Sequence, residues 1–109
     1  MTVHKLIESI GLTEFYVVEP DREVTGAYCG DLLSWVMSNA PVNSAWLTIM
    51  SNVNVAAVAV LTDVSCIILT EGVRPDASLL ERAEGQGINL LGSSLSTYEC
   101  ALRLGELLK

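Results

Sequence analysis

The sequence has few basic and aromatic residues, a single histidine and few prolines. Its 109 residues include 6 Lys and Arg against 13 Asp and Glu, which gives a formal net charge of -7 and an isoelectric point near 4.4. A negative field of this size repels the phosphates of nucleic acids and anionic lipid surfaces. We therefore expect neither a nucleic-acid partner nor a membrane partner.

The chain also lacks an uninterrupted apolar run of membrane-spanning length. Its mean hydropathy is +0.44, and no charged residue falls between Leu32 and Thr62. A transmembrane helix needs about 20 predominantly apolar residues, whereas Pro41 and several asparagines interrupt this stretch. The N-terminal residues, interrupted by Glu8, have no apolar signal-peptide core. A cytoplasmic location is the expectation that follows.

Cysteine and histidine are too sparse for the usual metal or redox sites. Cys29, Cys66 and Cys100 are far apart and form no C-x-x-C spacing, which argues against a disulfide framework and a tetrahedral metal site. We expect all three to be buried as small hydrophobic residues. His4 lies beside Lys5 in the first turn of a predicted helix, where it should be exposed. No metal, cofactor or catalytic histidine is expected.

The residues that are present alternate between helix and strand patterns. Thr2 and Gly11 are placed to begin and end a first helix, and Pro41 should stop a helix over residues 32–40. Ser96 to Glu99 forms a capping box for a terminal helix. The predicted strands are residues 15–18, 23–29, 45–50, 66–69 and 88–91, and two further helices are predicted over residues 52–61 and from Asp76 to Gly85 or Gly87.

This alternation predicts an α/β fold. Short connections after residue 45 and right-handed crossovers favour a mostly parallel or mixed sheet of about five strands, with helices on both faces. The helix over residues 52–61 is apolar all round, so we expect it to be buried on several sides. Trp35 and Trp46 stand in apolar patterns and are expected in the core. The length fits one domain over residues 1–109.

Small polar residues follow the predicted strands and give the candidate site. In a parallel sheet these loops gather at the carboxyl edge, the usual binding edge of open α/β folds. The stretch from Arg22 to Ser34 predicts a strand that ends in a glycine-bounded turn, whose N–H groups can hold a ligand oxygen. The candidate ligand-binding residues are Gly26, Gly30, Asp31, Ser51, Asn52, Asn54, Thr70, Glu71, Gly72, Ser93 and Ser94.

Each candidate also has a purely structural interpretation. Serine and asparagine begin helices, glycine permits turns, and Asp31 in a first helical turn would stabilise the helix dipole. Glu71, at the end of a buried strand, is the carboxylate best placed for catalysis, although charge at a strand end is ordinarily solvated. No lysine follows Gly30, so the turn is not a P-loop.

The block from Val24 to Met37, the strand over residues 45–50 with the helical sequence after it, and Thr70-Glu71-Gly72 resemble the DRTGG domain. Thr25-Gly26 of its namesake pattern is present, and Ala27 replaces the second glycine. Such domains are similar to the amino-terminal domain of the HPr kinase/phosphorylase and accompany phosphotransacetylases and regulated pyrophosphatases. The resemblance implies a dimerising or ligand-sensing module.

These observations favour a non-catalytic regulatory module, homodimeric, that binds a metabolite, a nucleotide or a partner protein. One alternative is an enzyme related to phosphotransfer, which the missing P-loop disfavours. The other alternative is a scaffold subunit of a larger metabolic complex, whose apolar residues cover a partner. An apolar content of 50% in a small domain predicts an uncovered apolar face.

Overall fold

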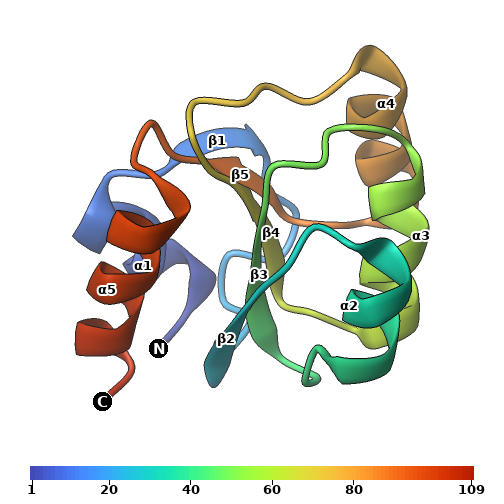
Figure 1. Cartoon of the computed structure of the whole chain (residues 1–109). Helices are drawn as coiled ribbons and strands as arrows, with labels where there is room; N and C mark the ends of the chain where they lie inside the picture. Colours follow the sequence, from blue (N-terminus) through green and yellow to red (C-terminus); the bar gives the residue numbers. More distant parts are fainter.

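The computed structural model describes all residues, 1–109, as a five-stranded sheet between two layers of helices (Figure 1). The sheet order is β1-β5-β4-β3-β2, and every neighbouring pair is parallel except β1 with β5. The mostly parallel, mixed α/β sheet predicted from the sequence is therefore confirmed. The strands are β1 (Thr13–Tyr16), β2 (Gly26–Cys29), β3 (Ser44–Thr48), β4 (Cys66–Leu69) and β5 (Leu90–Gly92).

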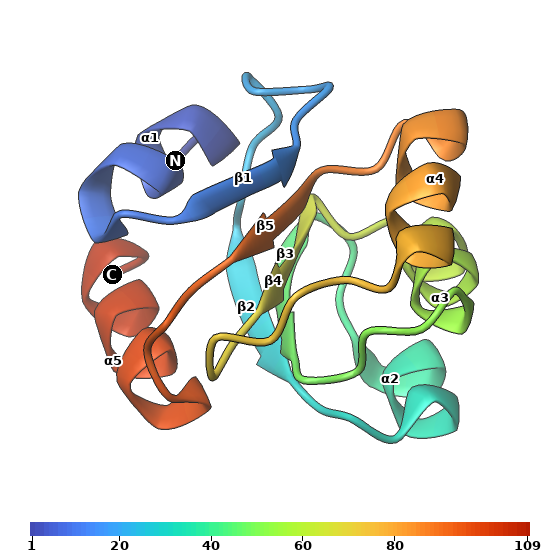
Figure 2. The ribbon, with the colours of Figure 1, turned by 90° about the horizontal axis from the view of Figure 1, so that it is seen from above.

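The helices divide between the two faces of the sheet, as a view along it shows (Figure 2). One face is covered by α1 and α5, and both chain termini lie on that side. The other face is covered by α2, α3 and α4. Their bounds are α1 (Val3–Ile10), α2 (Leu33–Asn39), α3 (Asn54–Thr62), α4 (Ala77–Gln86) and α5 (Thr97–Leu107).

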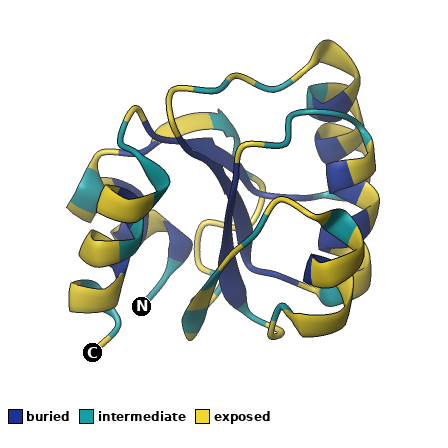
Figure 3. Cartoon of the chain, viewed as in Figure 1, coloured by how far each residue is buried: buried dark blue, intermediate teal, exposed yellow.

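Alternating side chains of the central strands supply both halves of the core. Trp46 and Ile67 pack with α2, α3 and α4, whereas Leu47 and Ile68 pack with α1 and α5. All residues of β3, β4 and β5 are buried. This burial is visible as a dark central sheet surrounded by exposed helical surface (Figure 3). The continuous apolar run of β4 follows directly from having helices on both faces.

Several predicted helix ends are confirmed by hydrogen bonds. The Thr2 side chain accepts from the N–H of Lys5, and Gly11 ends α1 at a φ of 65°. Ala40 is extended before Pro41, which ends α2. The Ser96 hydroxyl accepts a hydrogen bond from the N–H of Glu99, but the Glu99 carboxylate does not accept one from the N–H of Ser96, so only half of the predicted capping box is present. Asp76 precedes α4 as predicted, but its side chain does not cap that helix.

Other predictions of local structure are wrong in position. The first strand covers Thr13–Tyr16 rather than residues 15–18, and the second begins at Gly26 because Glu23 forms only an isolated bridge with Thr2. Helix α3 begins two residues later than predicted. It also leaves Val60 and Leu61 50% and 69% exposed, because only α2 and α4 flank it.

Two predictions of burial are also wrong. Cys66 and Cys100 are buried, but Cys29 is exposed because β2 is an edge strand. Trp46 is fully buried, whereas Trp35 is 63% exposed on α2. An apolar pattern on a two-turn helix does not reveal which of its faces meets the sheet. All five helices have 11 residues or fewer, and none reaches the length and apolarity of a membrane span.

Candidate functional site

The carboxyl ends of β2, β3, β4 and β5 lie at one edge of the sheet, because these four strands are parallel. Their loops bring ten of the eleven candidate residues to this edge. Gly26 is the exception. It pairs in register with Ser44, the first residue of β3, and therefore lies at the opposite edge from Gly30 and Asp31.

The turn after β2 is occupied by contacts within the chain. The N–H of Gly30 donates to Leu47 O at 3.1 Å, and Trp46 Nε1 donates to Gly30 O at 2.9 Å. A Cβ at Gly30 would meet Tyr28 and Val36 at 3.1 and 3.2 Å. The glycine is thus needed for close packing, and its N–H is not available to a ligand oxygen.

Asp31 does not lie in the first turn of a helix, as the sequence predicted. Helix α2 begins at Leu33, after a cap residue that makes no side-chain capping bond. The Asp31 carboxylate instead accepts from Thr48 Oγ1 at 2.8 Å and from the N–H of Ile49 at 2.9 Å. It therefore ties the end of β2 to the end of β3.

The polar residues after β3 organise the start of α3 and α4. Asn52 Oδ1 accepts from the N–H of Asn54 at 2.9 Å, and the Asn54 side chain is exposed without a hydrogen-bond partner. Ser51 Oγ donates to Asp76 Oδ1 at 3.1 Å. These contacts match the structural interpretation of serine and asparagine at helix starts.

Thr70 and Glu71 connect β4 to the start of α5. Thr70 Oγ1 and Thr97 Oγ1 lie 2.6 Å apart, and the Glu71 carboxylate accepts from the N–H of Thr97 at 2.9 Å. Glu71 adopts a left-handed φ of 61°, which is uncommon for a residue other than glycine. No buried side-chain nitrogen or oxygen in the chain lacks a hydrogen-bond partner.

The remaining candidates border a small cavity of about 110 Å³, which we call the carboxyl-edge pocket. It lies where the loops after β4 and β5 meet the beginning of β1. That meeting follows from the antiparallel register, which pairs Thr13 with Gly92. The pocket is lined by Thr13, Phe15, Gly72, Val73, Arg74, Gly92, Ser93 and Ser94.

Five lining residues were missed by sequence reasoning, namely Thr13, Phe15, Val73, Arg74 and Gly92. Thr13 and Phe15 belong to a strand whose antiparallel direction the sequence does not reveal. Arg74 could have been found, because it is a basic residue directly after Thr70-Glu71-Gly72. Its guanidinium carbon lies 5.5 Å from the centroid of the Phe15 ring, and it makes no ion pair.

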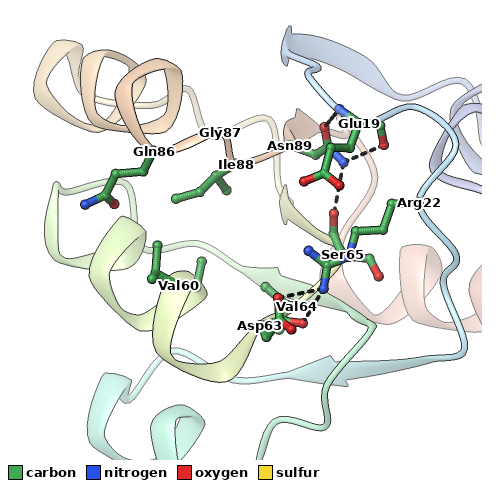
Figure 4. Close-up of a pocket in the computed structure, with 11 residues that line it drawn as sticks. Glu19, Arg22, Val60, Asp63, Val64, Ser65, Gln86, Gly87, Ile88 and Asn89 are labelled. Atoms are coloured by element: carbon green, nitrogen blue, oxygen red, sulfur yellow. Dashed lines mark hydrogen bonds and ion pairs between the residues drawn. The ribbon is translucent and has the colours of Figure 1, made fainter.

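A second pocket of about 180 Å³ lies at the amino edge (Figure 4). Arg22 Nη2 donates there to Asp63 Oδ1 at 2.8 Å and to Asp63 O at 2.7 Å. The Asn89 amide accepts from two backbone N–H groups and donates to the carbonyls of Glu19 and Ser65. The polar side chains of this pocket therefore form hydrogen bonds that connect neighbouring loops of the chain. Arg22 is already paired with the Asp63 carboxylate.

The amino-edge pocket has Glu19, Arg22 and Asp63 as titratable groups, of which the last two form an ion pair, whereas Arg74 is the titratable group of the carboxyl-edge pocket. His4 is exposed and lies 3.2 Å from Glu8 on α1. Nowhere do three His, Cys, Asp or Glu side chains come together as a set of metal ligands. The pKa values that depart clearly from normal belong to the cysteines, and burial raises the pKa of the Cys66 thiol to about 12.

Exposed apolar side chains lie on the two adjacent helices α2 and α3 and in the residue that precedes α2. We call this the α2–α3 surface, and it comprises Leu32, Trp35, Met37, Val60 and Leu61. It lies within the stretch between Leu32 and Thr62 that contains no charged residue. Contiguous exposed apolar patches are typical of interaction sites.

Comparison with known proteins identifies a family and a solved structure with a similar fold. The model of the DRTGG domain matches residues 43–107. No curated protein matches the sequence. A similar solved structure is that of the CBS and DRTGG domains of the regulatory region of Clostridium perfringens pyrophosphatase, complexed with its activator, diadenosine tetraphosphate.

That structure matches with a TM-score of 0.71 and 9% sequence identity. The match covers 94% of this chain and 45% of the other, so the chain spans less than half the length of that regulatory region. Identity this low shows a shared fold and nothing about the ligand of this chain.

Proposed function

The chain belongs to the DRTGG domain family, as its sequence predicted, and from this premise we propose that it is a non-catalytic regulatory module that binds a small molecule and dimerises. The observation that carries the proposal is the carboxyl-edge pocket. It lies at the edge where open α/β sheets bind ligands. Gly72, Ser93 and Ser94, three of the predicted residues, line it.

We propose a nucleotide or another small metabolite as the ligand. The similar pyrophosphatase regulatory region was solved with a nucleotide activator, which makes adenine nucleotides the first compounds to test. The pocket volume of about 110 Å³ is below the roughly 300 Å³ typical of sites that enclose a whole drug-sized molecule. The pocket would therefore hold one part of the ligand, with the rest at the surface.

Thermal unfolding with a panel of nucleotides and metabolites tests ligand binding. A ligand at about 100 times its dissociation constant should stabilise the fold by about 2.7 kcal/mol, which raises the melting temperature by roughly ten degrees in a domain of this size. Ser94→Leu should remove that shift by filling the pocket. Ser9→Leu, at an exposed serine on α1, is the matched control. A full shift in Ser94→Leu would place the ligand elsewhere.

The proposed lack of catalysis follows from how the carboxylates are used. Asp31 and Glu71 hold neighbouring elements together, and phosphoryl transfer needs groups free to bind metal and phosphate. We expect no ATP hydrolysis by the purified chain. Turnover that survives repurification and disappears in Asp31→Ala or Glu71→Ala would contradict this.

The α2–α3 surface supports the dimer. Because this region carries no charge, two copies can meet there without placing like charges opposite each other. We expect a dimeric mass by light scattering coupled to size exclusion. Leu61→Glu should give a monomer, whereas Leu102→Glu, at an exposed leucine on α5, should leave the dimer intact. A monomeric mass for the parent chain at micromolar concentrations would contradict the proposal.

A further inference from the structure

The carboxyl-edge pocket differs in charge from the other three pockets of the chain. Each of the others has at least one carboxylate next to its basic group: Glu19 and Asp63 with Arg22, Glu81 with Arg82, and Glu23 with the N-terminus and Lys109. The carboxyl-edge pocket has Arg74 and no acidic residue. In a chain with 13 Asp and Glu, this leaves one cavity with a locally positive lining.

Arg74 is held in place without losing its capacity to bind an anion. Its guanidinium carbon lies over the Phe15 ring, 5.5 Å from the centroid, which is a cation–π contact. The guanidinium makes no ion pair within the chain. Phe15 in turn lies against Gly92, where a Cβ would approach the ring to 2.5 Å. The glycine thus allows the ring to lie close to β5 and to support Arg74.

Further donors at the pocket have no acceptor in the chain. The backbone N–H groups of Ser94 and Arg74 make no hydrogen bond to another residue. The hydroxyls of Thr13 and Ser94, two exposed residues of the pocket lining, also have no hydrogen-bond partner within the chain. Several unpaired donors next to a guanidinium suit an oxyanion.

The size of the pocket limits what it can enclose. Its volume of about 110 Å³ is well below the roughly 300 Å³ of sites that enclose a whole drug-sized ligand. This is room for a single oxyanion group. A phosphate group uses more donors than a carboxylate, because it presents three or more oxygens.

We propose that the carboxyl-edge pocket is a phosphate subsite, in which Arg74 and the N–H groups of Ser94 and Arg74 bind one phosphate group of a phosphorylated small molecule. The inference rests on the proposed function, since it names the chemical group recognised at the same site. The nonphosphorylated part of the ligand would lie outside the pocket.

An NMR titration with inorganic phosphate tests the subsite. At constant ionic strength set with sodium chloride, we expect saturable shifts of the Ser94 and Arg74 amide signals and of the Arg74 side-chain N–H. Arg74→Gln should weaken binding at least tenfold, because it removes the charge and the paired donors. Arg82→Gln, at another arginine without an ion pair, is the matched control and should bind as the parent chain does.

One further variant and one further anion test whether the site is specific for phosphate. Gly92→Ala keeps every charge but displaces Phe15, so it should also weaken phosphate binding. Acetate should bind more weakly than phosphate. An equal or stronger response to acetate, or undiminished phosphate binding in Arg74→Gln, would overturn the phosphate assignment.

The same titration separates this inference from the proposed function. If phosphate produces no saturable shifts while an uncharged metabolite shifts the signals of Ser93 and Ser94, the phosphate subsite is wrong and the sensing role stands. If phosphate binds as described but no metabolite or nucleotide of the panel raises the melting temperature, the subsite is supported and the proposed sensing role fails.

Discussion

At the scale of single residues, most polar side chains of the carboxyl edge hold neighbouring elements together. Asp31 ties two strand ends, Asn52 supports the start of α3, and Glu71 contacts the start of α5. Their hydrogen-bonding capacity is largely used within the chain. The proposed ligand would instead use the unpaired donors around Arg74.

Asn52 and Asn54 are expected to differ in their effect on stability. Asn52→Ala removes the acceptor for the N–H of Asn54 and should lower the free energy of unfolding by about 1 kcal/mol. Asn54→Ala should change it by less than about 0.5 kcal/mol, because its exposed side chain has no partner. Urea denaturation measures both, and equal losses would show that the contact made by Asn52 is not the cause.

The raised pKa of the buried Cys66 thiol predicts that the folded chain loses stability at alkaline pH. Burial raises the pKa of this thiol from 9.0 to about 12, so above pH 9 the unfolded chain loses this proton while the folded chain keeps it. The free energy of unfolding should therefore fall between pH 9 and 12, by up to about 1.4 kcal/mol per pH unit from this group.

Denaturation of Cys66→Ala over the same pH range isolates that contribution. The variant should be less stable than the parent at pH 7, because it leaves a cavity, but its alkaline slope should be shallower. Cys29→Ala, at the exposed edge strand, should alter the slope less. A slope in Cys66→Ala as steep as that of the parent would contradict the prediction.

At the scale of elements, the start of α5 is fixed by groups from outside the helix as well as from its own cap. Ser96 Oγ accepts from the N–H of Glu99, and Glu71 accepts from the N–H of Thr97. A carboxylate at this position also interacts favourably with the positive end of the helix dipole. The loop after β4 and helix α5 should therefore be stabilised together.

Glu71→Ala should destabilise the chain by about 1 kcal/mol, because it removes an acceptor and a charge at the start of α5. The control is Glu81→Ala on α4, where the exposed carboxylate has no partner and the change should stay within about 0.5 kcal/mol. Amide hydrogen exchange should also be faster in the first turn of α5 in Glu71→Ala. If exchange there is unchanged, Glu71 does not hold that helix end.

At the scale of the whole molecule, the charged residues lie outside the region that carries the exposed apolar side chains of the α2–α3 surface. The chain carries a formal net charge of -7, yet the 32–62 region that forms the α2–α3 surface has none. Two copies that meet at this surface still repel each other through their remaining charge. Apolar contact is not screened by salt, whereas this repulsion is.

Dimerisation should therefore strengthen as the ionic strength rises. Going from about 0.01 M to about 0.15 M shortens the Debye length from about 30 Å to about 8 Å, which weakens the repulsion between two acidic copies. Sedimentation equilibrium should show a lower dissociation constant at the higher salt concentration. A dimer that weakens with salt would instead point to an interface built from ion pairs.

The order of elements and the fold class were determined by the sequence itself. The buried run Cys66–Leu69, the caps at Thr2 and Ser96 and the stop at Pro41 are local signals, because propensity and hydrogen bonds within a few residues decide them. The resemblance to the DRTGG domain likewise depended on residues that are close together in the chain.

Only the tertiary structure decided which residues from distant parts of the chain lie side by side. The antiparallel pairing of β1 with β5 brings Thr13 and Phe15 to Arg74, and the edge position of β2 exposes Cys29. Gly26 and Asp31, five positions apart in the sequence, lie at opposite edges of the sheet because an extended strand separates them. The order and direction of the strands, and the side of each helix that packs on the sheet, depend on contacts between distant residues. The spacing of residues along the sequence does not specify these contacts.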